Sequence, residues 1–84
     1  MIRKTLRIKS KLGLHARAAA KLVKLTSQFE SDIKLSRLNA GEQVDAKSIL
    51  GILLMAAARG TEIEVMTDGK DEEVAMEAVV QLVN

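Results

Sequence analysis

The apolar residues of this chain switch several times between the two-residue repeat of a strand and the longer repeat of a helix. Ile2, Leu6 and Ile8 alternate with polar residues, as in a strand with one buried face, and Lys4 is the one break in that pattern. Similar alternation predicts strands over residues 2–9, 32–36, 42–44 and 61–67. Helical spacing predicts helices over residues 16–29, 48–55 and 71–83.

Amphipathic strands and amphipathic helices together constrain the fold. Each strand needs a cover for one face, and each helix needs a surface to pack on. A small antiparallel sheet with all helices on one face meets both needs, in the order β-α-β-β-α-β-α. We therefore expect an α+β protein with residues 1–84 in a single domain, and turns at residues 39–41 and 68–69.

The three predicted helices differ in how their apolar residues are placed. The first has a stripe on one face, made of Ala18, Ala19, Leu22, Val23, Leu25 and Phe29. The last has a stripe made of Ala75, Ala78, Val79, Leu82 and Val83. The middle helix, with Asp45 or Ser48 as its N-cap, is apolar nearly all round, at Ile49, Leu50, Ile52, Leu53 and Leu54. A helix this short cannot bury every side, so we expect some of these side chains to be exposed.

Composition removes several classes of site. The chain has no cysteine and one histidine, which excludes disulfides and thiolate chemistry and argues against structural zinc. Phe29 is the only aromatic residue, so nucleic-acid bases would have almost nothing to stack on. We expect neither a metal nor a cofactor. There is no long apolar run near the N-terminus, and residues 49–58 reach about half of the ~20 residues of a membrane span, so we expect a cytoplasmic protein.

The charged residues are unevenly distributed, although the net charge is only +2. Residues 1–24 hold basic side chains and no acid: Arg3, Lys4, Arg7, Lys9, Lys11, Arg17, Lys21 and Lys24. Among residues 61–77, Lys70 is the only basic residue, and all other charged residues are acids: Glu62, Glu64, Asp68, Asp71, Glu72, Glu73 and Glu77. This division predicts a positive face suited to an acidic partner or to phosphate.

The only histidine, His15, stands where the first strand pattern gives way to the first helix pattern. The first backbone N–H groups of a helix have no partners within the helix, and the helix dipole favours negative charge there. The dipole also favours neutral imidazole, the nucleophilic form, over imidazolium. His15 is therefore either an ordinary exposed histidine or a nucleophile that accepts a phosphoryl group.

Three neighbours of His15 complete this candidate site. The N–H groups of Ala16 and Arg17 can donate to phosphate oxygens, and the Arg17 guanidinium can add a charge-assisted hydrogen bond of about 1.5–3 kcal/mol. Gly13 lets the chain turn and lets a partner's donor group come close. Arg17 alone would be a solvated cation, but its place two residues after His15 favours phosphate binding.

Two segments carry a resemblance to a known family. Gly13-Leu14-His15-Ala16-Arg17-Ala18-Ala19 resembles the histidine phosphorylation signature of the HPr family, the phosphocarriers of bacterial phosphoenolpyruvate-dependent phosphotransferase systems. Lys47-Ser48-Ile49-Leu50-Gly51 is similar to the serine-containing motif of that family, and the likeness covers essentially the whole chain. The resemblance implies an open-faced β-sandwich, with a four-stranded antiparallel sheet and three helices on one side.

The resemblance also implies a role and partners. His15 would accept a phosphoryl group on Nδ1 from Enzyme I and pass it to an EIIA domain, so the chain would be a carrier and covalent intermediate rather than an enzyme. A monomer is the natural form for a carrier that docks several partners, and neither a membrane nor a nucleic acid is among those partners. Ala18 stands where the family commonly has proline, which would stiffen the first helical turn. We expect this to alter the rigidity of the site and to leave its chemistry intact.

Ser48 has two interpretations. Serine is a good helix N-cap, which would be a purely structural role. In the HPr family a serine at this place is phosphorylated by a dedicated enzyme, HPr kinase/phosphorylase, in many bacteria. A phosphate here would put a charge of about −1.5 to −2 beside Ile49 and Leu50, and would weaken the docking of Enzyme I if these side chains form its surface.

A docking surface is predicted around the middle helix. Ile49, Leu50 and Leu53 are its candidates, because a short helix with so many aliphatic residues has more than it can bury. The alternative is a place in the core, which we expect for at least half of the apolar run. Lys24 and Lys47 form either a basic rim facing an acidic partner or ordinary solvated lysines.

Two other classes of protein compete with the carrier interpretation. A nucleic-acid-binding module would use stacking aromatics or a phosphate-clamping glycine loop, and the chain has neither. A free-standing enzyme would need more reactive groups than one histidine, and no P-loop is present. Within the HPr family, residues 11–15 look like the nitrogen-related branch and residues 47–49 like kinase-regulated members, so sugar uptake and nitrogen-related regulation both stay open.

Overall fold

The computed structural model describes residues 1–39 and 42–83, which form four strands and three helices in the expected order. The strands are β1 Ile2–Arg7, β2 Asp32–Arg37, β3 Gln43–Asp45 and β4 Glu62–Asp68. The helices are α1 Ala16–Thr26, α2 Ile49–Met55 and α3 Glu72–Val83. The turn expected at residues 39–41 lies outside the described residues except for Asn39.

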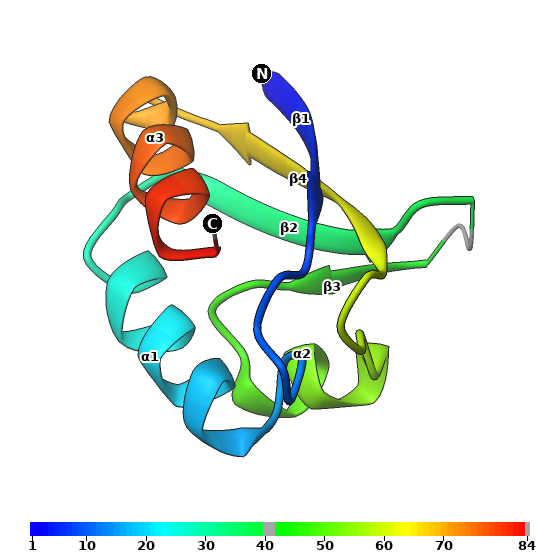
Figure 1. Ribbon diagram of the computed structural model, residues 1–84. Coiled ribbons are helices and arrows are strands. Elements are labelled where there is room, and N and C mark those ends of the chain that lie inside the picture. Colours follow the sequence, from blue (N-terminus) through cyan, green and yellow to red (C-terminus); the bar gives the residue numbers. More distant parts are fainter. Residues whose placement is uncertain (40–41, 84) are drawn as a thin grey trace.

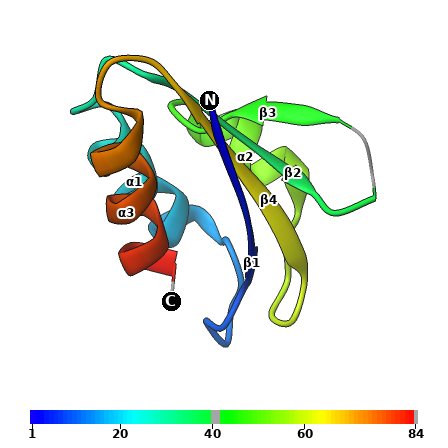
Figure 2. The same ribbon diagram turned by 90° about the horizontal axis from the view of Figure 1, so that it is seen from above.

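The strands form one antiparallel sheet in the order β1-β4-β2-β3. In the register, Leu6 of β1 is opposite Ile63 of β4, and Leu35 of β2 is opposite Val65 of β4. The three helices cover one face of this sheet and leave the other face open (Figures 1 and 2). The expected fold class, an α+β open-faced sandwich, is confirmed.

The core lies between the sheet and the helices and is entirely aliphatic apart from methionine and buried threonine and serine. Alternate residues of β2 and β4 supply its sheet side, namely Ile33, Leu35, Ile63 and Val65. The helices supply Ala19, Leu22, Ile52, Met55, Ala75, Met76 and Val79. Each fully buried aliphatic side chain is worth about 1.5–3 kcal/mol relative to exposure, which is how a chain without disulfides holds this fold.

The first helix is shorter than expected, since it ends at Thr26 instead of residue 29. Thr26 is fully buried, and its hydroxyl donates to the Ala46 carbonyl at 2.8 Å and to the Val23 carbonyl at 3.2 Å. This tie to the segment before α2 fixes where α1 stops. Phe29 then packs against the core from the loop as a half-buried side chain.

The apolar stripe of α3 also differs from the expected one. Met76 is 2% exposed although it was not predicted to lie in the stripe, whereas Leu82 was predicted to lie there and is 42% exposed. The buried face of α3 is centred on Ala75, Met76 and Val79, where the helix meets β1, β4 and α1. Leu82 instead borders the hollows beside α1, while the next residue, Val83, packs against the core.

Most of the apolar side chains of α2 are exposed. Ile52 is buried, whereas Ile49, Leu50, Leu53 and Leu54 are 44%, 66%, 36% and 73% exposed. The expectation that the core takes at least half of this run is therefore wrong. A seven-residue helix presents one narrow face to α1, β2 and β3, and that face is filled by Ile52 and Met55.

Pairing of β1 with β4 changes the expected charge distribution. Arg3 lies 2.9 Å from the Glu64 carboxylate, and Arg7 lies 3.6 Å from that of Glu62. Part of the basic N-terminal segment is thus paired with the acidic segment, which narrows the positive face predicted from the sequence.

No helix within residues 1–39 and 42–83 is long and apolar enough to cross a bilayer.

Candidate functional site

His15 is the N-cap of α1. Its backbone is extended (φ −78°, ψ 178°), its side chain is half-buried, and its carbonyl accepts the N–H of Ala19 at 2.8 Å. Because that is the first bond of the helix, the N–H groups of Ala16, Arg17 and Ala18 have no partner inside it. The first turn of α1 contains no acid. The imidazole therefore stands beside an uncompensated, positively polarised helix end.

The loop that carries His15 is held by a close contact between backbones. Gly13 has φ +67°, and a Cβ placed there would lie 2.5 Å from the Ala57 carbonyl oxygen and 2.8 Å from Cα of Ala58. The N–H of Leu14 donates to that same Ala57 oxygen at 2.9 Å. Gly13 does allow the turn, as expected. The expected room for a partner's donor group is instead filled by this contact, and Gly13 is buried.

The segment between α2 and β4 is the base on which the His15 loop rests. The N–H of Ile8 donates to the Thr61 carbonyl at 2.9 Å, and the N–H of Gly60 donates to the Ile8 carbonyl at 2.8 Å. Ala56 ends α2 in the left-handed region (φ 51°, ψ 44°), with its N–H donating to the Leu53 carbonyl. The end of α2 therefore sets the position of the loop that precedes α1.

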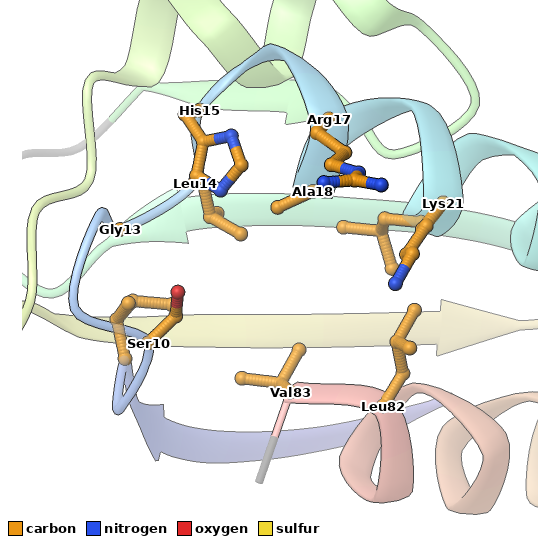
Figure 3. Close-up of a pocket in the computed structure, with 11 residues that line it drawn as sticks. Ser10, Gly13, Leu14, His15, Arg17, Ala18, Lys21, Leu82 and Val83 are labelled. Carbon is orange, nitrogen blue, oxygen red and sulfur yellow. The ribbon is translucent and has the colours of Figure 1, made fainter.

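A hollow of about 240 Å³ opens beside His15 (Figure 3). The lining comes from the segment between β1 and α1, the first turns of α1 and the last turn of α3: Ile8, Ser10, Gly13, Leu14, His15, Arg17, Ala18, Lys21, Leu22, Leu82 and Val83. His15, Arg17 and Lys21 are the lining residues with a basic side chain, and none of the lining residues that the structure describes has a carboxylate side chain. The floor of the hollow is apolar and its rim is positive.

The structure brings the predicted anion-binding groups to one place. His15 and Arg17 line the same hollow, and the N–H groups of Ala16 and Arg17 lie at the helix end beside it. Ala18, where proline is common in the family, keeps one further N–H in this turn. A ring nitrogen, several unpaired N–H donors and a guanidinium are together suited to form and stabilise a bond between histidine and a phosphoryl group.

Ser48 and Lys47 take part in bonds at the start of α2. The Ser48 hydroxyl accepts the N–H of Gly51 at 3.1 Å, so it is the N-cap, and the side chain is half-buried. The Lys47 ammonium donates to the Phe29 carbonyl at 2.7 Å, which joins the start of α2 to the loop after α1. Lys24 is exposed in the last turn of α1. The two lysines predicted to form one rim therefore stand in different surroundings.

The exposed aliphatic side chains of α2 form what we call the α2 patch: Ile49, Leu50, Leu53 and Leu54. Leu54 was not among the predicted docking residues, and neither was Leu12, which is 74% exposed in the loop before His15. Leu12 could have been predicted as an exposed residue from the sequence, because it is an apolar residue in a short loop just before the His15 motif.

This fold and this site define a class of protein: a small α+β domain with its one histidine at the start of a helix, beside N–H groups that have no partner in that helix. Residues 2–84 match the family model described as "PTS HPr component phosphorylation site". The chain therefore belongs to the HPr family, the phosphocarriers of the phosphotransferase system. A protein of this family is a phosphocarrier and not an enzyme in the usual sense.

Individual relatives agree with this assignment. Phosphocarrier protein HPr of Cupriavidus necator is 48% identical over 83 residues, which cover 99% of this chain and 91% of that protein. The HPr of Xylella fastidiosa is 50% identical over 82 residues, covering 98% and 90%. The crystal structure of HPr-C-His from Thermoanaerobacter tengcongensis has a TM-score of 0.92 at 40% identity, covering 99% of this chain and 91% of that one. The resemblance stated from the sequence is confirmed.

Proposed function

We propose that His15 is the residue that carries the phosphoryl group. The observation that supports this is its place as N-cap of α1, beside the unpaired N–H groups of Ala16 and Arg17 and in one hollow with the Arg17 guanidinium. In the accepting step, a ring nitrogen of His15 (Nδ1 by resemblance to the family) attacks phosphorus and forms the N–P bond. The bond from phosphorus to the donor breaks, and the donor keeps that electron pair.

The neighbouring groups stabilise charge during this transfer. The N–H groups of Ala16 and Arg17 donate to the phosphoryl oxygens, and the guanidinium neutralises part of their negative charge. The helix end is fixed before the reaction begins, so little reorganisation is needed at the moment of transfer. Passing the group on is the reverse step, with the partner's nucleophile as the attacking atom.

The partners in this relay are Enzyme I as donor and an EIIA domain as acceptor. The α2 patch supports a docking role, because four aliphatic side chains of a surface helix are exposed together. Lys24 adds a cation for an acidic partner. A single copy of the chain contains every residue assigned to the transfer, so we propose a monomer as the working form.

Ser48 is proposed as a regulatory phosphorylation site. A phosphate on its hydroxyl would lie at the positive end of α2, which suits the helix, and would place negative charge next to Ile49 and Leu50. Ser48→Asp imitates that charge and keeps an N-cap acceptor. We expect this variant to keep its folding stability while its KM for phosphorylation by Enzyme I rises; an unchanged KM would reject the regulatory role.

The test of this function is phosphorylation in a defined system. The protein is incubated with phosphoenolpyruvate and Enzyme I, and the modified residue is mapped by mass spectrometry. We expect an acid-labile phosphate on His15 that is absent in His15→Ala. No label on His15, under conditions in which another HPr is labelled, would overturn the proposal. Discharge by a sugar-specific or by a nitrogen-related EIIA domain then identifies the branch.

A further inference from the structure

Lys21 lies in the hollow that contains His15 and Arg17, one turn further along α1. Arg17 and Lys21 are four residues apart, so their side chains share one face of the helix. Figure 3 shows both side chains on the side of α1 that faces the hollow. The second cation of the rim therefore comes from a residue outside the His15 motif.

The geometry of a helix brings Lys21 back toward His15. From His15 to Lys21 the chain rises about 9 Å along the axis, and helical side chains lean toward the N-terminal end. The lysine stem is long and flexible, and it ends in a compact charge. Lys21 also lines the neighbouring groove between α1 and α3, together with Leu82, which borders both hollows. Its ammonium can thus lie over either hollow.

The charges around Lys21 are unbalanced in the absence of an anion. Like charges four residues apart on a helix repel each other. Helix α1 contains Arg17, Lys21 and Lys24 but no acid. Among residues 1–39 and 42–83, the charged or titratable groups that line the hollow are His15, Arg17 and Lys21. An anion placed between the two cations of the rim would relieve this repulsion.

We propose that Lys21 is the second cation of the phosphoryl site: when His15 carries the phosphoryl group, the Lys21 ammonium turns toward it and shares its negative charge with the Arg17 guanidinium. This inference rests on the proposed function of His15. It makes Lys21 a determinant of how stable the phosphorylated state is, and it does not require that Lys21 touch a partner.

The test is a pH titration of the isolated protein by NMR, with and without the phosphoryl group on His15. A nearby cation lowers the pKa of a phosphohistidine, so its removal in Lys21→Gln raises that pKa, by about 0.3–0.7 unit for a charge several ångströms away near the surface. In the unphosphorylated protein, where no phosphoryl charge attracts the ammonium, we expect Lys21→Gln to have a smaller effect on the NMR signals of the imidazole. Lys70→Gln is the matched control, because it removes one exposed lysine in the β4–α3 turn, far from the start of α1 (Figure 1).

Each outcome decides the matter. The proposal is supported if Lys21→Gln has a larger effect in the phosphorylated form than in the unphosphorylated form. Lys70→Gln should then show no such effect, and Lys21→Arg, which keeps the positive charge, should behave like the wild type. Equal shifts of Lys21→Gln in both forms, or a shift no larger than that of Lys70→Gln, overturn it and leave the role of His15 untouched. A wild-type protein without phosphate on His15 would instead overturn the proposed function itself.

Discussion

Arg17 is the residue whose removal separates binding of the phosphoryl group from the chemistry of His15. In Arg17→Gln the imidazole and the N–H groups remain, but the charge-assisted hydrogen bond is lost. Its value of about 1.5–3 kcal/mol corresponds to a fall of about 10- to 150-fold in kcat/KM for phosphorylation by Enzyme I. Arg17→Lys should recover part of the rate, since it keeps the charge without the planar fork. A value for Arg17→Gln within twofold of the wild type would remove Arg17 from the site.

Gly13 should be costly to replace with any residue that has a Cβ. Alanine there combines φ +67° with a Cβ 2.5 Å from the Ala57 carbonyl oxygen, so we expect Gly13→Ala to lower the free energy of unfolding by at least about 2 kcal/mol. Gly60→Ala is the control, because Gly60 has φ +87° but nothing within 4 Å of a Cβ. Gly60→Ala should lower the free energy of unfolding by only about 1 kcal/mol in urea denaturation, because alanine there has the unfavourable positive φ but no steric clash. Equal costs for the two variants would show that the contact with Ala57 is unimportant.

The sequence alone predicts which residues lie together when those residues are neighbours in the chain. His15, Ala16 and Arg17 are adjacent, so a motif and a helix start were enough to place them together. The contact of Gly13 with Ala57 joins positions distant in sequence, and no local pattern reveals it. The bond from Lys47 to the Phe29 carbonyl is likewise a product of packing.

The C-terminus of α2 contains a strained residue that can be improved. Ala56 adopts the left-handed conformation (φ 51°, ψ 44°), which costs alanine about 1–2 kcal/mol and which glycine adopts without steric strain. We expect Ala56→Gly to raise the free energy of unfolding by about 0.5–1 kcal/mol in urea denaturation. Ala20→Gly, in the exposed middle of α1, should lower it by about 1 kcal/mol. A loss of stability in Ala56→Gly would contradict this account of how α2 ends.

Helices and strands were predicted well where their own sequence shows one buried face. They were predicted poorly where contacts with other elements determine an end or the degree of burial. Alternation located β1, β2 and β4 to within about two residues. The end of α1 depends on the hydroxyl of Thr26 reaching the Ala46 carbonyl, which periodicity cannot show. The burial of α2 was overestimated because a run of aliphatic residues looks the same whether it faces a core or a partner.

The stability of the whole molecule should depend on pH because of one carboxylate in the connection between β4 and α3. The Asp71 carboxylate accepts the Ser31 hydroxyl and, at 2.9 and 3.0 Å, the N–H groups of Glu30 and Ser31. The hydrogen bond from the Ser31 hydroxyl, followed by that from the Glu30 N–H, lowers the Asp71 pKa below its usual value of 3.8. These bonds join the loop after α1 to the start of α3.

The pH dependence follows from the sign of that shift. A carboxyl with a lowered pKa in the folded state stabilises the fold above its unfolded pKa of about 3.9, and this contribution is lost as the pH falls through the folded value. Asp71→Asn should therefore be less stable than the wild type at pH 7. The difference should shrink below pH about 4 in urea titrations at several pH values. A difference that is constant from pH 7 down to pH 2 would show that Asp71 acts through something other than its charge.

The overall architecture was predictable in class but not in detail. Amphipathic strands and helices require an antiparallel sheet with one covered face, and both features are present. The order β1-β4-β2-β3 follows from pairings that join residues far apart, such as Ile2 with Thr67, and only the structure shows them. The same pairings place basic Arg3 and Arg7 against acids, which the uneven charge of the sequence did not suggest.

The most direct test of the central claim is an NMR comparison of the protein before and after phosphorylation by Enzyme I, with the backbone amides and the His15 ring nitrogens observed together. The account predicts one phosphorylated ring nitrogen on His15 and the largest amide shifts at Ala16 and Arg17, whose N–H groups donate to the phosphoryl oxygens. An unmodified His15 ring, or shifts centred on Ser48 with Ala16 and Arg17 unchanged, would contradict it.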